Sequence, residues 1–234
     1  MTGWRRDASW RRDASWRLSR LGTSRLYLCS GMRRDRGDLP QFLDAVLAAG
    51  VDVVQLREKE ATRDELRAAA ASFRAAARRH AALFIVNDDP ELAAEVDADG
   101  VHVGQEDPSP EQARAAVGPQ RLVGRSTHTV VEIDRALDED CDYFAVGPVH
   151  ATPTKIGRPP IGVEPVRHAS RSAGRRPWFA TGGMEPATVQ PVIAAGGRRI
   201  VVVRALTESP DPAAVASQLA GTLADAASAG WSPP

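Results

Sequence analysis

Charged and polar side chains directly follow an apolar run in residues 51–62, VDVVQLREKEAT. The segment ends in Gln55, Arg57 and Lys59, and Lys59 and Lys155 are the only lysines among 30 basic residues. So strong a bias toward arginine suggests that lysine persists where a compact ammonium is needed and a planar guanidinium does not serve. Chance retention of two surface lysines is the alternative interpretation.

Oxygen ligands follow the next two apolar runs. Asn87, the only asparagine, and Asp88 end the run ALFIVND at 82–88, and Asp107 follows GVHVGQ at 100–105. Carboxylates and amides are hard ligands that suit Mg²⁺, which keeps several waters and also binds substrate phosphates. The pattern predicts a magnesium site at Asp88 and Asp107. Ordinary solvated loop aspartates are the alternative for either residue alone.

Phosphate binding is indicated at two places. Arg57, Lys59 and Lys155 supply three positive charges, which suit a diphosphate. The pair Gly182-Gly183 follows a later apolar run, and backbone N–H groups in such a position suit a second phosphate. No Cys/His metal cluster, Ser-His-Asp triad or dinucleotide-binding loop competes with these features in the sequence. His128 is a possible base, although a lone loop histidine is more often structural.

The elements that must position these residues alternate between two patterns. Strand-like runs cover 26–31, 51–56, 82–88, 100–105, 121–127, 141–149, 178–183 and 198–206. Helical patterns cover 40–50, 63–80, 90–96, 109–117, 129–139, 163–173, 186–195 and 211–228. Eight such units in about 205 residues predict an α/β protein, a single-domain (β/α)₈ TIM barrel. An open doubly wound sheet would more often carry a glycine-rich fingerprint after its first strand, and LYLCSGMRRD has none.

In such a barrel the carboxyl ends of all strands meet at one mouth. The polar residues named above lie at the ends of predicted strands or in the loops that follow them, so we expect them to gather there. The barrel is predicted to span residues 25–230.

Residues 1–24 are unlike the rest of the chain. The net charge is zero, yet this segment is strongly basic and repeats WRRDAS at 4–9 and at 10–15. A basic arm bearing tryptophan could contact nucleic acid or an anionic membrane. A disordered extension explains the composition as well, so we expect residues 1–24 to be a disordered tail outside the fold and assign them no function.

Six segments together resemble the thiamine-phosphate synthase (thiamine-phosphate pyrophosphorylase) family across residues 26–207. They are QLREK (55–59), VNDD (86–89), DGVHVGQED (99–107), GRSTH (124–128), GPVHATPTK (147–155) and TGGM (181–184). The resemblance implies a transferase that condenses hydroxymethylpyrimidine diphosphate with thiazole phosphate to give thiamine phosphate and pyrophosphate.

The resemblance also implies roles for individual residues. Mg²⁺ would be bound by Asp88 and Asp107. The pyrimidine diphosphate would be held by Gln55, Leu56, Arg57, Glu58, Lys59, Asn87, Ser126 and Lys155, of which Arg57, Lys59, Ser126 and Lys155 would be catalytic. The thiazole phosphate would be held by Thr152, Pro153, Thr154, Gly183, Val203 and Arg204. Arg204 departs from the family, because many relatives carry a small polar residue there.

The chemistry is compatible with this interpretation, because a dissociative path through a pyrimidine-methyl cation needs no protein nucleophile. Two alternatives remain: a thiazole tautomerase of the same fold that uses a histidine base, and a non-catalytic thiamine-precursor binder. We expect small-molecule substrates, neither nucleic acid nor membrane as partner, and a cytoplasmic location with Cys29 and Cys141 as reduced, buried thiols. A homo-oligomer is left open.

Overall fold

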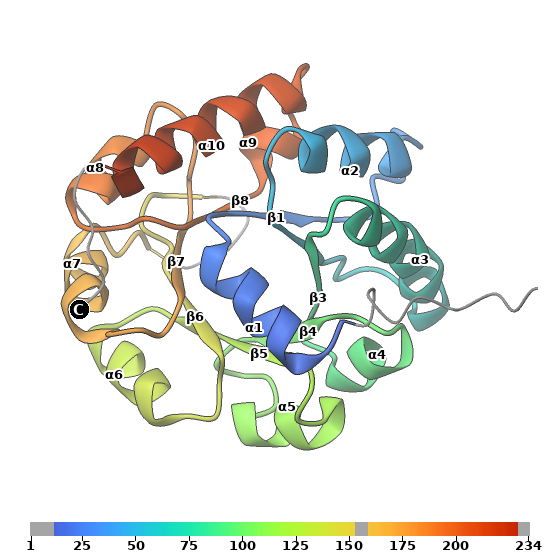
Figure 1. Cartoon of the computed structure of the whole chain (residues 1–234), viewed down its shortest axis with the longest axis horizontal. Coiled ribbons are helices and arrows are strands. Elements are labelled where there is room, and N and C mark those ends of the chain that lie inside the picture. The colour runs from blue at the N-terminus through green and yellow to red at the C-terminus, as the bar shows by residue number, and fades with distance from the viewer. Residues whose placement is uncertain (1–11, 153–158, 229–234) are drawn as a thin grey trace, which may run out of the picture.

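The strands of the protein form a closed barrel. The computed structural model describes residues 12–152 and 159–228. All eight strands are parallel and pair in the order β1 to β8, with β8 closing against β1 (Figure 1). The strands are β1 (Leu26–Ser30), β2 (Val53–Leu56), β3 (Leu83–Asn87), β4 (Gly100–Val103), β5 (Leu122–Thr127), β6 (Tyr143–Val146), β7 (Trp178–Thr181) and β8 (Ile200–Val202). The predicted single-domain (β/α)₈ barrel is confirmed.

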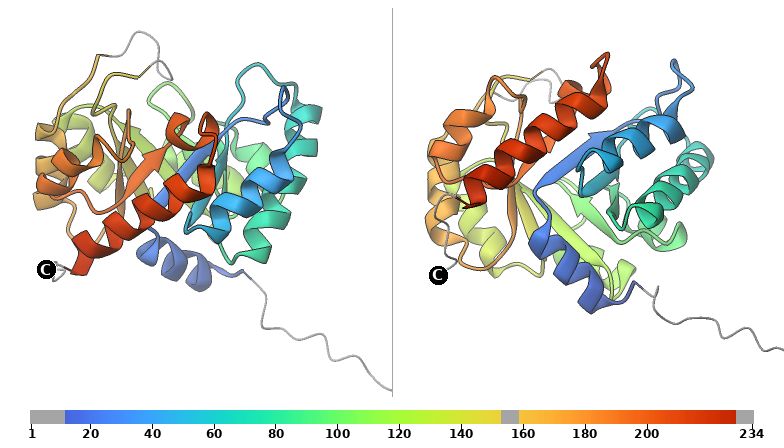
Figure 2. Two further views of the ribbon diagram at one scale, coloured as in Figure 1. Left: turned by 90° about the horizontal axis from the view of Figure 1, so that it is seen from above. Right: turned by 45° about the horizontal axis from the view of Figure 1, so that its top comes forward.

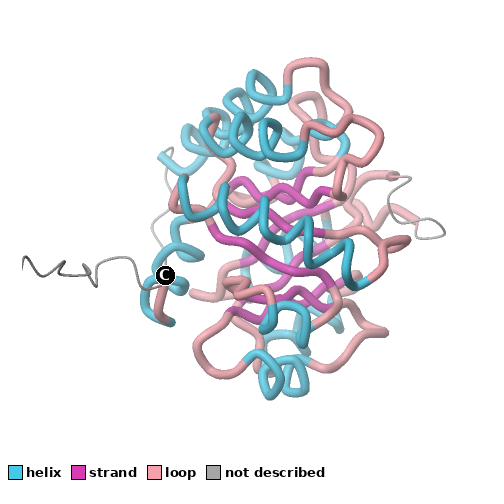
Figure 3. The backbone as a smooth tube through the Cα atoms, turned by 90° about the vertical axis from the view of Figure 1, so that its right-hand side faces the viewer, coloured by secondary structure: helices cyan, strands magenta, loops and turns pink. Residues whose placement is uncertain are grey.

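Helices surround the strands on the outside (Figures 1 and 3). Those that follow strands are α2 (Leu39–Ala48), α3 (Arg63–Arg79), α4 (Pro90–Glu95), α5 (Pro110–Val117), α6 (Val130–Asp138), α7 (Glu164–Ser172), α8 (Val189–Ala194), α9 (Arg204–Thr207) and α10 (Pro212–Ser228). Local signals set where several begin: Thr62 with Glu65 and Ser109 with Gln112 form capping boxes at α3 and α5. Among the described residues, none of the helices combines the length and the apolar content that a bilayer crossing requires.

Alternate strand residues face two separate cores, as the period of a strand requires. The outer core lies between strands and helices and includes Leu28, Val54 and Phe84. The inner core fills the barrel with a smaller set of side chains: Leu21, Tyr27, Val53, Leu83, Ile85, Leu122, Tyr143 and Phe179. Residues that continue the inner face toward the strand ends therefore point into the mouth of the barrel.

The N-terminal segment corrects the prediction of a disordered tail over residues 1–24. Residues 14–23 form helix α1 (Ala14–Thr23), which begins at Asp13, whose side chain accepts a hydrogen bond from the Trp16 N–H. The helix lies across one end of the barrel, at the amino ends of the strands (Figures 1 and 2). Residues 1–11 lie outside the described part of the chain.

Two kinds of interaction, apolar burial and ion pairs, hold α1 in place. Leu21 is buried in the inner core. The buried Asp99 accepts from Arg12 and from Arg17 Nε at 3.1 Å, and Arg20 pairs with Asp52 at 2.7 Å. These arginines, which indicated a solvated tail in the sequence, are thus paired with carboxylates of the barrel. The prediction of a disordered tail was wrong because composition does not show such distant partners.

The predicted strand 198–206 is too long. Strand β8 ends at Val202, and residues 204–207 form the short helix α9 instead. Val203 and Arg204 consequently lie at the turn between the two elements, beside the mouth of the barrel.

Candidate active site

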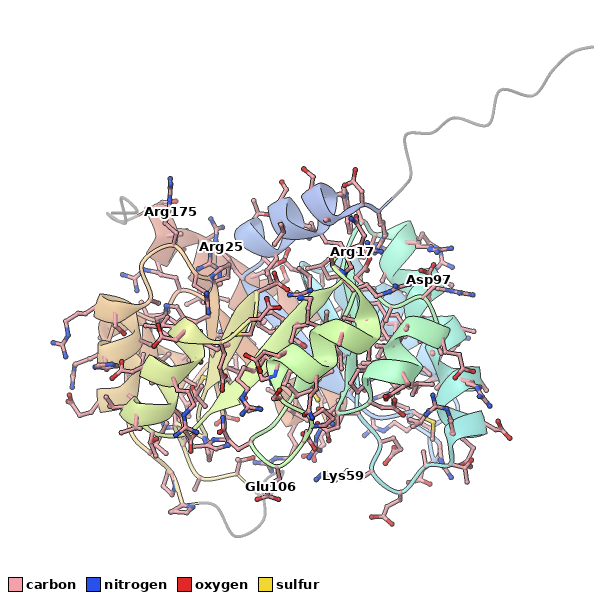
Figure 4. The ribbon with its side chains drawn as sticks, turned by 90° about the horizontal axis from the view of Figure 1, so that it is seen from below. Arg17, Arg25, Lys59, Asp97, Glu106 and Arg175 are labelled. Atoms are coloured by element: carbon pink, nitrogen blue, oxygen red, sulfur yellow. The ribbon has the colours of Figure 1, made fainter. Side chains whose placement is uncertain are left out.

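A cavity of about 210 Å³ opens at the carboxyl ends of the strands. Many predicted site residues line it: Gln55, Arg57, Asn87, Ser126, Thr152, Gly183, Val203 and Arg204. Figure 4 places Lys59 and Glu106 at this end of the molecule, opposite α1 and Arg17. The structure therefore brings the polar ends of strands β2, β3, β5 and β8 into one mouth.

Other predicted residues are placed differently. Leu56 is buried in the outer core, so its side chain is turned away from the cavity. Glu58 accepts a hydrogen bond from the Met32 N–H at 3.4 Å and so belongs to the rim. Lys59 is exposed. Pro153, Thr154 and Lys155 lie outside the described residues.

Asp88 and Asp107 face each other beside the mouth, although they come from the loops after β3 and β4. Burial raises the pKa of Asp88 to about 6, and a hydrogen bond and charge repulsion from Asp107 add to the rise. The positive charges of Arg57 and Lys59 oppose it. Asp107 is itself held by the Gly104 N–H at 2.7 Å. Because burial and a neighbouring carboxylate disfavour the charged form of Asp88, a divalent cation bound between Asp88 and Asp107 would relieve this repulsion.

Gly182 and Gly183 bring the loops after β6 and β7 into direct contact. Both have positive φ, at 95° and 63°. A Cβ on Gly182 would lie 2.4 Å from Pro148 Cα, and one on Gly183 would lie 2.7 Å from His150 Cβ. The Thr188 hydroxyl also donates to the Gly183 carbonyl at 2.6 Å, which fixes this turn. Side chains are therefore excluded here, and the backbone itself borders the cavity.

Sequence reasoning missed several cavity residues that lie within strands: Tyr27, Cys29, His102 and Thr181. Gln55 donates to the Tyr27 hydroxyl at 2.7 Å, which lies 3.1 Å from the Tyr143 hydroxyl. His102 bridges the Tyr143 hydroxyl at 3.3 Å and the Ser126 hydroxyl at 3.0 Å. The sequence does contain a signal for such residues, which is a polar residue within an otherwise apolar strand. His102 in GVHVGQ is an example.

His128 has a structural role. Its Nδ1 lies against the carbonyl of Gly147, and its backbone N–H donates to Glu132 at 2.6 Å. It is not among the described residues that line the cavity. The cavity therefore gives no support to His128 as a base.

The mouth of this (β/α)₈ barrel combines a carboxylate pair, basic side chains and a two-glycine turn. Together these features are typical of enzymes that act on phosphorylated small molecules. The family described as thiamine monophosphate synthase matches residues 26–206, and the chain belongs to this family. It is accordingly an enzyme, a transferase of thiamine biosynthesis.

Individual relatives agree. The thiamine-phosphate synthase of Acidothermus cellulolyticus is 50% identical over 209 residues, covering 88% of this chain and 98% of the relative. That of Thermobifida fusca is 51% identical over 213 residues, covering 90% and 97%. Among solved structures, thiamine phosphate pyrophosphorylase from Pyrococcus furiosus superposes with a TM-score of 0.79 at 27% identity, covering 89% of this chain and 98% of the other. The predicted family is confirmed.

Proposed function

We propose that the protein joins 4-amino-2-methyl-5-(diphosphooxymethyl)pyrimidine to 4-methyl-5-(2-phosphooxyethyl)thiazole, giving thiamine phosphate and pyrophosphate. The observation that carries the proposal is that one cavity borders both halves of the predicted site. Gln55, Asn87 and Ser126 line it on one side of the barrel, and Gly183 and Val203 line it after β7 and β8. The two phosphorylated substrates could thus bind side by side in one cavity.

The pyrimidine diphosphate is assigned to the side formed by β2, β3 and β5. Gln55 and Ser126 are buried hydrogen-bonding groups at the cavity wall, suited to the pyrimidine. Arg57 lines the same cavity, and Lys59 lies near enough to influence Asp88, which supports assigning both charges to the diphosphate. Asn87, which lines the cavity, and the rim residue Glu58 belong to this half of the assignment. The buried Leu56 could contribute only through its backbone, because its side chain lies in the outer core.

We propose that Mg²⁺ binds at Asp88 and Asp107. The raised pKa of Asp88 supports the fit, since the pair carries more negative charge than its burial favours. No cluster of three or more His, Cys, Asp or Glu able to hold a metal occurs in the part of the chain that the structure describes. A site with two carboxylates that leaves its remaining positions to water and diphosphate oxygens agrees with the usual coordination of Mg²⁺. When bound, the ion would neutralise charge on the leaving pyrophosphate.

The thiazole phosphate is assigned to the opposite side. The turn at Gly182-Gly183 and the residues Val203 and Arg204 offer backbone N–H groups beside the cavity. Thr152 lines the same region, and Pro153, Thr154 and Lys155 would follow it by sequence. Arg204 is exposed at the cavity rim and adds a positive charge there.

The proposed chemistry requires the protein to hold the two substrates in position and to stabilise the leaving pyrophosphate. The bond between the pyrimidine methylene carbon and the diphosphate oxygen breaks, and pyrophosphate takes the electron pair. The thiazole nitrogen then donates its lone pair to that carbon. Arg57, Lys59 and Lys155 would stabilise the departing charge, and Ser126 would hold the pyrimidine toward the thiazole. No protein nucleophile is required.

The direct test is to mix both substrates with Mg²⁺ and measure thiamine phosphate; its absence would contradict the proposal. Calorimetry separates the alternatives. Diphosphate binding that requires Mg²⁺ favours the synthase, and binding of thiazole phosphate alone favours a tautomerase. Binding of both substrates without turnover favours a non-catalytic binder.

We also propose a cytoplasmic location, which is supported by two buried cysteines, neither of which forms a disulfide within the described part of the chain. Cell fractionation with an antibody to the protein tests this location. Recovery in a membrane or secreted fraction would contradict it.

A further inference from the structure

Five buried polar side chains form one continuous hydrogen-bonded chain through the barrel interior. We call Gln55, Tyr27, Tyr143, His102 and Ser126 the buried relay. Its successive links measure 2.7, 3.1, 3.3 and 3.0 Å. The two ends, Gln55 and Ser126, come from β2 and β5, and the links between them run through residues of β1, β6 and β4. Both ends line the cavity, as do Tyr27 and His102, whereas Tyr143 is not among the described residues that line it.

The directions of these bonds are coupled. A phenol has one proton to donate, and a neutral imidazole has one N–H and one acceptor nitrogen. One order results when Gln55 Nε2 donates to Tyr27 and each hydroxyl accepts from one neighbour in the chain and donates to the next. Tyr27 then donates to Tyr143, Tyr143 donates to His102 Nδ1, and His102 Nε2–H donates to Ser126. Ser126 then has its own proton free for a ligand, while the Gln55 oxygen is turned away from Tyr27 as an acceptor.

The reverse order is a second self-consistent arrangement, and it requires the Gln55 amide to be flipped so that its oxygen accepts from Tyr27. Ser126 then donates to His102, and the chain ends on the Gln55 oxygen. Gln55 now offers an N–H to a ligand, and Ser126 offers a lone pair. In either order, one end of the relay donates to the ligand while the other accepts.

The surroundings keep the relay intact. Burial raises the pKa of Tyr27 and of Tyr143, so both remain neutral phenols at physiological pH. Phe179 packs edge-on against both rings, at centroid distances of 5.4 and 5.8 Å. A Cβ on Gly124 would lie 2.2 Å from Tyr143 Cζ and 2.5 Å from His102 Nδ1, so the link between them requires glycine at this position.

We infer that Tyr27, Tyr143 and His102 are positioning residues that set Gln55 and Ser126 in opposite hydrogen-bonding senses and so select an aminopyrimidine. The inference rests on the proposed function. An aminopyrimidine carries an amino group that donates and ring nitrogens that accept, which is one partner for each end of the relay. A pyrimidine without the amino group leaves one end unpaired in a buried site, and that loss weakens binding.

The test is calorimetry in Mg²⁺ with three probes: the aminopyrimidine diphosphate, its analogue lacking the 4-amino group, and inorganic pyrophosphate. In Tyr143→Phe we expect the aminopyrimidine Kd to rise by about tenfold, the loss of roughly one hydrogen bond. The Kd of the analogue should rise less, so discrimination between the two shrinks. The pyrophosphate Kd and the KM for thiazole phosphate should not change.

Tyr27→Phe should have the same effect, and the double variant should be little worse than either, because one break already uncouples the ends. The matched control is Thr127→Val, which removes another buried hydroxyl of β5 that donates to the Ala145 carbonyl at 3.0 Å. It should leave all three Kd values unchanged.

Three results would overturn the inference: parallel weakening of all probes in Tyr143→Phe, additive effects in the double variant, or the same change in Thr127→Val. Failure of the proposed function looks different. Wild-type protein would then bind the aminopyrimidine diphosphate no more tightly than pyrophosphate, and the inference would be overturned with it.

Discussion

Replacing Leu21 with alanine tests whether α1 is part of the folded barrel. Leu21 is only 2% exposed and belongs to the same buried cluster as Tyr27 and Phe179, whereas Leu18 on the same helix is 50% exposed. Truncating a fully buried leucine costs about 2–5 kcal/mol, and we expect about 3 kcal/mol for Leu21→Ala because it closes one end of the inner core. For a domain of this size that lowers the melting temperature by roughly 6–12 °C.

Leu18→Ala is the matched control, because it makes the same chemical change on the same helix with a similar effect on helix propensity. It should change the free energy of unfolding by less than about 0.5 kcal/mol. Urea and thermal unfolding measure both variants, and kcat and KM measured well below the transition should stay near wild type since α1 lies opposite the cavity. Equal stabilities for Leu21→Ala and Leu18→Ala would refute docking of α1.

Three further predictions concern the mouth. Lys59→Arg, and likewise Lys155→Arg, should lower kcat by on the order of a hundredfold, because a longer, forked cation displaces diphosphate oxygens. Steady-state kinetics measure this, with Arg171→Lys at an exposed position as the control. Wild-type kcat in all three variants would contradict the prediction. Asp107→Asn should sharply reduce turnover at limiting Mg²⁺ without lowering the melting temperature, and wild-type activity there would contradict the metal assignment. The pKa of Asp88 is about 6 in the folded protein and 3.8 in the reference state, so the folded state binds more protons between these two values and this group's contribution to stability falls as pH rises through that window. The gain in melting temperature from Mg²⁺ should therefore be larger at about pH 7.5 than at about pH 5. An equal gain at both pH values would contradict this prediction.

The barrel could be predicted from the sequence because short apolar runs alternate with amphipathic helical patterns along the chain. Runs such as ALFIVND are apolar on both faces, as a strand between two cores must be, and the observed β3 covers most of that run. The polar ends of the strands could be predicted for the same reason, because topology alone brings them together. Val203 and Arg204 were placed in a strand, since IVVVRAL contains nothing that separates a strand from the short turn of α9.

Helix α1 could not be predicted in this way. Its arginines indicated a solvated segment, and the partners that bury them, Asp99 and Asp52, lie far away in the sequence. Asp99 also accepts from the Phe84 N–H at 3.0 Å, so the carboxylate that receives α1 is part of the barrel wall. The second copy of the WRRDAS repeat supplies both the helix cap Asp13 and the ion-pairing Arg12.

The two ends of the barrel use buried polar groups in opposite ways. At the closed end, Asp99 is paired with Arg17 of α1 and with Arg12, which precedes that helix, and such pairing fixes one arrangement of the chain. At the open end, Gln55 and Ser126 are held by the interior of the barrel on one side and face the cavity on the other. Tyr27 and Tyr143 resemble ordinary core residues in the sequence because their rings are core residues, and only their hydroxyl groups belong to the site. Substitution of the rings should therefore disturb folding, whereas removal of the hydroxyls alone should disturb recognition.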